Sequence, residues 1–429
     1  MKQIIKTLRG LWWSQELRRK LLFTLILTAF FRLIAFVPLF GVDIAALQNI
    51  LASNQLLGVM NIFSGGTLAN FSVAAIGISP YITASILLQV SGLFFPKIKE
   101  MQKESESTRA QLQQWTRFLS VPIGVMQSLS LIFLLRSQSL LTASHPFDLA
   151  TMILSLVAGS LIVMWIGELV TKNGIGNGTS WIIFVGIISG IPQSITQTWA
   201  LRSFIGAGTV LMVGAALLAL MASVVFMQQA VRRIPIQQAK RQRGSSVYGG
   251  SMSHIPIKVI QFGVMPIIFA LPILSLPTTI ATLLLNIDIP ASLVEITRSV
   301  QALFTPGSTF YTWLYFLFVF GFTFFSIFIY FNPKDFAEDL KKSGAFVPGV
   351  RPGKPTSQLL MRVLLRISFV GGLYLALIAV LPLLAQNFTG VTTLTLGGTG
   401  LLIVVSVILD MLNQVQSQLV HDRYEEYIQ

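Results

Sequence analysis

The sequence is short of charge and has no cysteine at all. Only 11% of its 429 residues are charged, whereas 53% are hydrophobic and the mean hydropathy is +0.74. Soluble domains carry about 25% charged residues, so a water-soluble globule of this composition would expose large apolar patches. The lack of cysteine excludes disulfides and thiolate chemistry. We therefore expect an integral membrane protein.

Clusters typical of metal or catalytic sites are also missing. The three histidines lie more than a hundred residues apart and show no metal-ligand spacing. We expect no metal site, no cofactor and no catalytic residue. The basic N-terminus continues into a full-length apolar stretch, so we expect a retained first helix rather than a cleaved signal peptide.

Ten apolar stretches are long enough, or nearly so, to cross a bilayer as helices. Two of them contain glycine and proline and are expected to be broken or bent: Gly77 and Pro80 in the second, and Gly263 and three prolines in the seventh. The ten stretches are 21–40, 71–95, 118–135, 149–170, 180–200, 204–227, 259–285, 310–331, 367–385 and 394–412.

The net charge of +14 is confined to one side of this arrangement. With ten spans, 26 of the 30 Lys and Arg residues fall in segments on the side of the termini, and three fall in the opposite loops. In a soluble protein the excess would suggest nucleic acid. In a membrane protein this asymmetry places both termini in the cytoplasm.

The parity of the spans predicts two inverted halves. A division near 200 leaves five spans on each side, and a repeated unit with an odd number of spans must be inverted. We expect an N-terminal half (1–200), a C-terminal half (201–414) and a short cytoplasmic tail (415–429). The cytoplasmic loops 231–258 and 332–366 are too long and too basic to be simple connectors. The outer segment 41–70 carries one charge and predicts a short helix that folds back into the protein.

Two glycine-rich motifs resemble nucleotide-binding loops only superficially. GIGNG at 174–178 lacks the preceding strand and the later acidic residue, so a turn before the fifth span is favoured. In RPGKPT at 351–356, Pro355 stands where a phosphate loop needs Ser or Thr, and a chain expected to be all-helical offers no preceding strand. We reject both as phosphate sites.

Charges within the predicted spans are rare. Arg32 and Glu168 lie toward helix ends, and we favour pairing or snorkelling for both over a functional role. The later spans carry essentially no midplane carboxylate or lysine, which a proton- or ion-coupled transporter would normally need. Ile82 and Ile86, like Ile183 and Ile187, are spaced i, i+4, which by itself indicates only lipid-facing or packing residues.

Several segments closely resemble the SecY family of protein-conducting channels. They are NIFSGGTLANFSVAAIGISPYITASILLQ at 61–89, GELVTKNGIGNGTSWIIFVGIISGIP at 167–192, FNPKDFAEDLKKSGAFVPGVRPGKPT at 331–356 and GGTGLLIVVSVILDMLNQVQSQL at 397–419, together with LRRKLLFTL at 17–25 and RRIPIQQAKRQRG at 232–244. The resemblance implies an all-α membrane protein of ten helices. Their two inverted five-helix halves would form a clam-shell hinged between spans five and six.

The resemblance also implies the parts of a channel. A plug at about 56–70 would include Asn61, Ile62, Phe63, Ser64, Gly65 and Gly66. A lateral gate between spans two and seven would include Pro80, Thr83, Gln89, Ile260 and Pro266. An apolar pore ring would consist of Ile82, Ile86, Ile183, Ile187, Ile268 and Ile403.

The partners implied by the family are other proteins. The basic loops would bind the motor ATPase SecA or the ribosome through Arg232, Arg233, Lys240, Arg241, Arg243, Arg351 and Lys354. The small membrane subunits SecE and SecG would complete the channel, and no sequence-specific contact with nucleic acid is expected. Secretory and membrane proteins with signal sequences would be the substrates, and a bacterial inner membrane, or alternatively a plastid thylakoid, would be the location.

The sequence departs from the family pattern at three places. Ile260 stands where Asn is usual, Ser245 and Ser246 replace basic residues, and STR at 107–109 stands where Gly-Arg-Arg is common. These changes concern gate polarity and motor docking. Two other functions stay open at this point: a secondary transporter of a small solute, and an insertase or lipid-handling scaffold without a gated pore.

Overall fold

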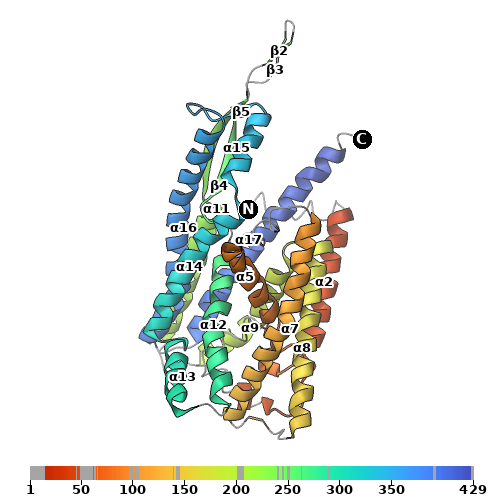
Figure 1. Ribbon diagram of the computed structural model, residues 1–429, viewed down its shortest axis with the longest axis vertical. Helices are drawn as coiled ribbons and strands as arrows, with labels where there is room; N and C mark the ends of the chain where they lie inside the picture. The colour runs from red at the N-terminus through yellow and green to blue at the C-terminus, as the bar shows by residue number, and fades with distance from the viewer. Residues whose placement is uncertain are drawn as a thin grey trace. The chain divides into compact units, whose positions relative to one another are not determined.

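The computed structural model is mainly helical (Figure 1). It describes residues 15–44, 46–48, 61, 64, 66–95, 98, 101, 106–138, 140–141, 145–200, 207–238, 241–243, 246–248, 252–261, 263–287, 290–389 and 393–426.

Each of the ten predicted stretches contains a helix. They are α2 (Gln15–Ala35), α5 (Ser79–Phe94), α7 (Glu106–Ser137), α8 (Pro146–Asn173), α9 (Gly178–Ala200), α11 (Ala207–Gln229), α12 (Met265–Leu285), α14 (Thr309–Tyr330), α16 (Lys354–Thr389) and α17 (Thr393–Glu426). Among the described residues, six of these (α7, α8, α12, α14, α16 and α17) contain segments long and apolar enough to cross a membrane. Two further helices, α13 (Ala291–Leu303) and α15 (Pro333–Lys342), are short and amphipathic.

The two interrupted stretches are confirmed. The second becomes helical only at Ser79, after a series of turns in which Gly77 has a φ of +61°. The seventh becomes helical at Met265, after Gly263 with a φ of +54°, and it contains Pro272 and Pro277. Glycine reaches these positive φ values without steric cost, so each stretch turns before its helix begins.

The chain packs as two compact units. Unit 1 contains residues 1–215, 271–312 and 382–429, and unit 2 contains 216–270 and 313–381. These units do not coincide with the halves expected from span parity, because α17 belongs to unit 1. The five-helix halves therefore remain a prediction from topology.

Unit 1 is organised around α7 and α8, which lie side by side with α2 beside α8 (Figure 1). One apolar cluster joins α7 and α8 to the segments near Leu47 and Phe71, both fully buried. A second, smaller cluster joins Leu17 of α2, Ile175 of the α8–α9 turn and Val415 of α17. Helix α17 therefore packs against α2 near Leu17, close to the start of α2.

Unit 2 contains a small sheet that the sequence analysis did not anticipate. Strand β1 (Val231–Gln238) pairs antiparallel with β4 (Met252–Lys258) and, at its end, with β5 (Ala345–Phe346). The loops 231–258 and 332–366 thus meet in one sheet, over a core of Ile234, Ile257, Val347, Leu360 and Leu364. The expectation that the chain holds no strand was wrong at these loops, where water satisfies the edge groups that a bilayer would not. Strands β2 (Arg241–Arg243) and β3 (Ser246–Tyr248) pair antiparallel along their whole length and form a second, two-stranded sheet in the same loop.

Candidate functional site

Five of the six predicted ring residues lie in unit 1, and all five are buried. Ile82 and Ile86 are on α5, Ile183 and Ile187 on α9, and Ile403 on α17. Burial within the protein rules out the lipid-facing reading of their spacing.

Helices α9 and α17 pack closely at the ring positions. A Cβ on Gly400 would lie 3.0 Å from Cγ2 of Ile187, so this glycine allows α17 to approach α9. The sixth residue, Ile268 on α12, is buried in unit 2.

The predicted plug residues that the structure describes, Asn61, Ser64 and Gly66, are joined by local hydrogen bonds. The Ser64 hydroxyl donates to the carbonyl of Asn61 at 2.9 Å, and the Gly66 N–H donates to the same carbonyl at 2.8 Å. The Asn61 side chain accepts from the N–H of Ala69 in the short helix η1 (Leu68–Asn70). Ile62, Phe63 and Gly65 lie outside the described residues.

The predicted gate residues on α5 are held by short polar contacts. Pro80 and Thr83 are buried, and the Thr83 hydroxyl donates to the carbonyl of Ser79 at 2.9 Å. Gln127 Nε2 on α7 donates to Thr83 Oγ1 at 3.4 Å, and Gln89 Nε2 donates to Ser85 Oγ at 3.0 Å. The other two gate residues, Ile260 and Pro266, are buried in unit 2.

A cavity of about 70 Å³ adjoins the Gln127 side chain within unit 1. The hydroxyls of Ser79, Ser130 and Thr278 contribute to its otherwise largely apolar wall. Gln127 Oε1 is buried and accepts no hydrogen bond from any residue that the structure describes. A buried amide oxygen of this kind is commonly satisfied by water.

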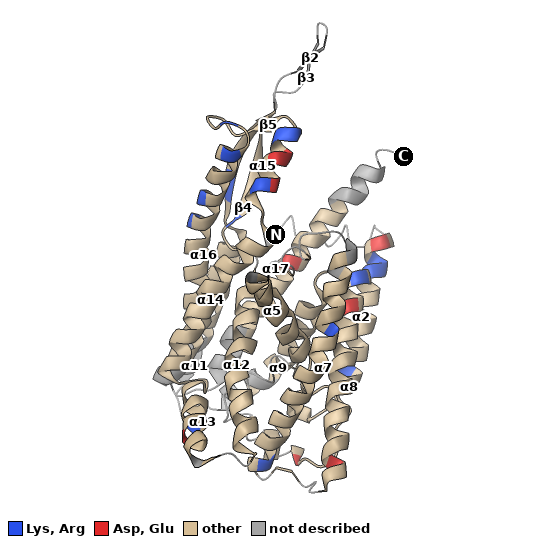
Figure 2. Ribbon diagram, viewed as in Figure 1, with Lys and Arg blue, Asp and Glu red and all other residues tan. Residues whose placement is uncertain are grey.

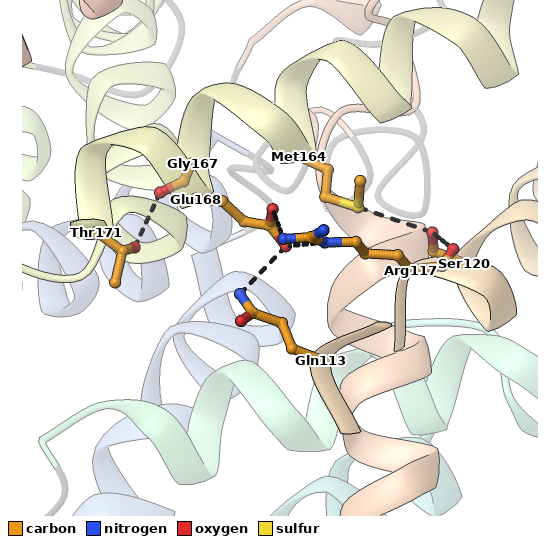
Figure 3. Close-up of polar contacts among 7 residues, drawn as sticks. All are labelled: Gln113, Arg117, Ser120, Met164, Gly167, Glu168 and Thr171. Carbon is orange, nitrogen blue, oxygen red and sulfur yellow. Dashed lines mark hydrogen bonds and ion pairs between the residues drawn. The ribbon is translucent and has the colours of Figure 1, made fainter. Parts of the chain in front are cut away.

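Both span-associated charges have partners, as expected. Glu168 on α8 accepts from Arg117 on α7, with Nη2–Oε2 at 2.7 Å and Nε–Oε1 at 2.9 Å, and Gln113 Nε2 lies 3.3 Å from Oε1 (Figure 3). The two-point geometry suits guanidinium and carboxylate and makes the pair directional. Arg32 on α2 donates from Nη2 to the backbone carbonyl of Val185 on α9 at 3.1 Å.

The two glycine-rich motifs are turns at helix starts. In GIGNG, Asn177 Oδ1 accepts from the N–H groups of Thr179 and Ser180, which caps α9. In RPGKPT, the Thr356 hydroxyl donates to the carbonyl of Arg351 at the start of α16. Among the described residues, no group of three His, Asp or Glu side chains could hold a metal ion.

The predicted docking residues that the structure describes lie in unit 2. Arg232 and Arg233 are exposed on β1, and Arg351 and Lys354 are exposed at the start of α16. Figure 2 shows Lys and Arg recurring on α15, β1, β4 and the first turns of α16, whereas α12 and α14 are largely uncharged. Arg241 and Arg243 lie in β2, and Lys240 lies outside the described residues.

The amino-acid sequence is similar to those of several known proteins. The family described as SecY matches residues 72–412. The chain is 38% identical to the protein translocase subunit SecY of Bacillus licheniformis over 440 residues, which covers 99% of this chain and 100% of that protein. It is 38% identical to the corresponding protein of Corynebacterium glutamicum, covering 96% and 97%. The chain belongs to the SecY family.

Solved structures support the SecY fold. One described as the structure of a protein conducting channel matches with a TM-score of 0.65 at 18% identity, covering 93% of this chain and 92% of that one. Sec61 in the canine ribosome–channel complex from the endoplasmic reticulum matches with a TM-score of 0.60 at 16% identity, over the same shares. The SecY-family assignment expected from the sequence motifs is thus confirmed, and with it a multi-pass membrane protein.

Sequence reasoning missed one set of polar contacts beside the predicted ring. Thr24, Thr28 and Arg32 are spaced i, i+4, i+8 on α2, and each contacts the α8–α9 turn or α9. These three polar residues share one face of the part of α2 after Lys20, which is otherwise apolar. Their spacing was thus a signal of polar contacts on that face, although it does not identify the partners.

Proposed function

We propose that the chain is the protein-conducting subunit of a Sec translocase. It passes unfolded secretory polypeptides across the membrane and releases transmembrane segments sideways into lipid. The observation that most supports this proposal is the burial of five isoleucines on three helices of one unit: Ile82, Ile86, Ile183, Ile187 and Ile403. Apolar branched side chains can close around an extended chain without binding any particular sequence.

The proposed pore needs no fixed charge at its narrowest point. Two charged side chains on helices of unit 1 are bound within the protein. Glu168 forms an ion pair with Arg117, and Arg32 donates a hydrogen bond to the backbone carbonyl of Val185. A transporter coupled to protons or ions would instead present a carboxylate or amine to its cargo. This favours the channel over a secondary transporter.

Partner docking is the proposed role of the sheet built from the two basic loops. The energy for transport would come from SecA or from the ribosome, which would contact the exposed Arg232, Arg233, Arg351 and Lys354, with Lys240, Arg241 and Arg243 in the same loop. SecE and SecG are the proposed membrane partners. The chain itself would be a passive channel in the bacterial inner membrane with both termini in the cytoplasm.

Transport by reconstituted vesicles tests this function. The full chain is placed in lipid vesicles with its candidate partner subunits, and protease protection of a secretory polypeptide is measured beside uptake of radiolabelled small solutes. We expect protected polypeptide that depends on the motor and on the signal sequence, and no solute accumulation. Solute uptake without polypeptide import would favour the transporter instead.

A further inference from the structure

Arg32 is a charged side chain in the last turn of α2, far from the other charges of that helix. Those described charges lie between Glu16 and Lys20, and Arg32 follows Lys20 by 12 residues, or about 18 Å of helix. A charged group that follows so long an apolar segment is stabilised by a partner inside the protein. Arg32 has two: the Val185 carbonyl at 3.1 Å, and the ring of Phe31, whose centroid lies 5.9 Å from the guanidinium carbon.

Two threonines extend this contact toward the cytoplasm. Thr28 Oγ1 accepts from the indole Nε1–H of Trp181 on α9 at 2.7 Å, one turn before the Arg32 contact on both helices. Thr24 Oγ1 accepts from the backbone N–H of Ile175 in the α8–α9 turn at 3.2 Å. We call Thr24, Thr28 and Arg32, with these three partners, the α2–α9 ladder.

Each threonine hydroxyl in the ladder both donates and accepts a hydrogen bond. Thr24 donates to the carbonyl of Lys20 at 2.9 Å, and Thr28 donates to the carbonyl of Thr24 at 2.7 Å. Each hydroxyl therefore donates within α2 and accepts from across the gap. This fixes the direction of the hydroxyl and gives the two helices a defined register along their length.

The last rung of the ladder lies at the proposed seal. Val185 stands between Ile183 and Ile187, both buried, and Arg32 binds its backbone rather than a side chain. The same part of α9 contacts the proposed plug: a Cβ on Gly66 would lie 3.2 Å from Ser189 Oγ and 3.3 Å from the carbonyl oxygen of Gly186. About two turns of α9, residues 183–189, therefore carry two proposed ring residues, contact the proposed plug and are held by Arg32.

We propose that the α2–α9 ladder positions α9 so that the pore is sealed at rest, with Arg32 as the positioning residue closest to the ring. The inference rests on the proposed function, because it assigns Ile183 and Ile187 to the seal. Without the ladder, α9 could rotate or shift along its axis, which would move both isoleucines and the contact surface for Gly66. The closed state would lose stability relative to the open state, whereas the path itself would remain intact.

The test is resting ion conductance per channel, with the full chain reconstituted in planar bilayers. Arg32→Gln removes the hydrogen bond to the Val185 carbonyl, and Trp181→Phe removes the one to Thr28. Arg298→Gln on α13 is the matched control for loss of an arginine charge. For Arg32→Gln we expect about a tenfold higher resting conductance, the factor that one charge-assisted hydrogen bond in the closed state would supply. For Trp181→Phe, which removes a neutral hydrogen bond, we expect a smaller increase of about threefold to tenfold. Arg298→Gln should behave as the unmodified chain, and Arg32→Lys should recover most of the seal.

A purely structural role would give another pattern. It would lower the yield of folded protein while leaving conductance per channel unchanged, and that result would overturn the proposal. If Arg32→Gln fails to fold, the near-isosteric Thr28→Val carries the same test, together with Trp181→Phe.

Ile183→Asn separates this inference from the function on which it rests. If the resting ion conductance rises in Ile183→Asn but not in the ladder variants, the ladder proposal is wrong and the assignment of the ring is retained. If Ile183→Asn does not leak either, the assignment of the ring is wrong and the ladder proposal falls with it.

Discussion

Arg117 and Glu168 join α7 to α8 by two parallel contacts, of 2.7 and 2.9 Å. The Glu168 side chain is only 11% exposed, whereas that of Arg117 is 45% exposed. The carboxylate is therefore the partner that depends more on the pair. Gln113 adds a third donor to the same carboxylate, so loss of the arginine would leave Glu168 with one neutral donor from this cluster (Figure 3).

Arg117→Met should therefore destabilise the protein by about 1–3 kcal/mol, because it leaves a shielded carboxylate without its cation. The matched control is Lys342→Met, which breaks the exposed pair with Asp339 at 3.9 Å and should change stability by less than about 0.5 kcal/mol. Unfolding in detergent micelles, followed by denaturant titration, measures both. If the two substitutions lower the free energy of unfolding equally, the α7–α8 ion pair contributes no more to stability than an exposed ion pair does.

Gly178→Ala should strongly destabilise the chain. A Cβ at this position would overlap the carbonyl oxygen of Gly167 and press on Val170, so α8 and α9 would have to separate at their turn. Gly321→Ala on α14 is the control. Among the described residues, no atom outside the neighbouring backbone of its own helix lies within 4 Å of the added Cβ, so this substitution should be neutral or slightly stabilising. The yield of folded monomer by size-exclusion chromatography compares them. A Gly178→Ala protein as stable as Gly321→Ala would contradict this close packing.

Ile403→Asn should weaken the proposed seal. The side chain is 1% exposed on α17, so a polar amide there would admit water where the ring excludes it. We expect a higher resting ion leak and export of substrates with defective signal sequences. Ile408→Asn, on the same helix but 41% exposed, should change neither property. The same leak from both variants would remove Ile403 from the ring.

Arg351→Glu should impair partner docking without affecting the fold. Arg351 is exposed at the loop before α16, and its backbone carbonyl, not its guanidinium, accepts the Thr356 hydrogen bond. We expect weaker binding of SecA or ribosomes to the reconstituted channel and unchanged thermal stability. Arg298→Glu, exposed on α13, is the control and should leave binding unchanged. Normal binding by Arg351→Glu would exclude it from the docking surface.

Much of the helical architecture could be predicted from the sequence, because a bilayer imposes long apolar stretches with internal hydrogen bonds. The breaks before Ser79 and Met265 were predictable as well, since Gly and Pro determine local backbone geometry. Family motifs then supplied the ring positions, which the isoleucine spacing alone could not distinguish from ordinary packing.

The sheet and the ladder were not predicted, and for different reasons. Strand β1 pairs with β5 across more than a hundred residues, and its sequence VRRIPIQQ contains a proline and two adjacent arginines, which obscure the strand signal. Thr24 and Thr28 resemble the other hydroxyl residues of the spans until their partners are known. Pairing across elements depends on tertiary geometry, which no local pattern specifies.

The most direct test of the channel is crosslinking of a polypeptide stalled during transport. A photoreactive amino acid is placed at Ile86 or Ile268, and in a control at Ile408, and a secretory chain is arrested by a folded domain at its end. The channel predicts crosslinks from the two ring positions that depend on the motor and the signal sequence, and none from the exposed position on α17. Absence of crosslinks at Ile86 and Ile268, with the arrested chain bound to the protein, would contradict a path through the isoleucine ring.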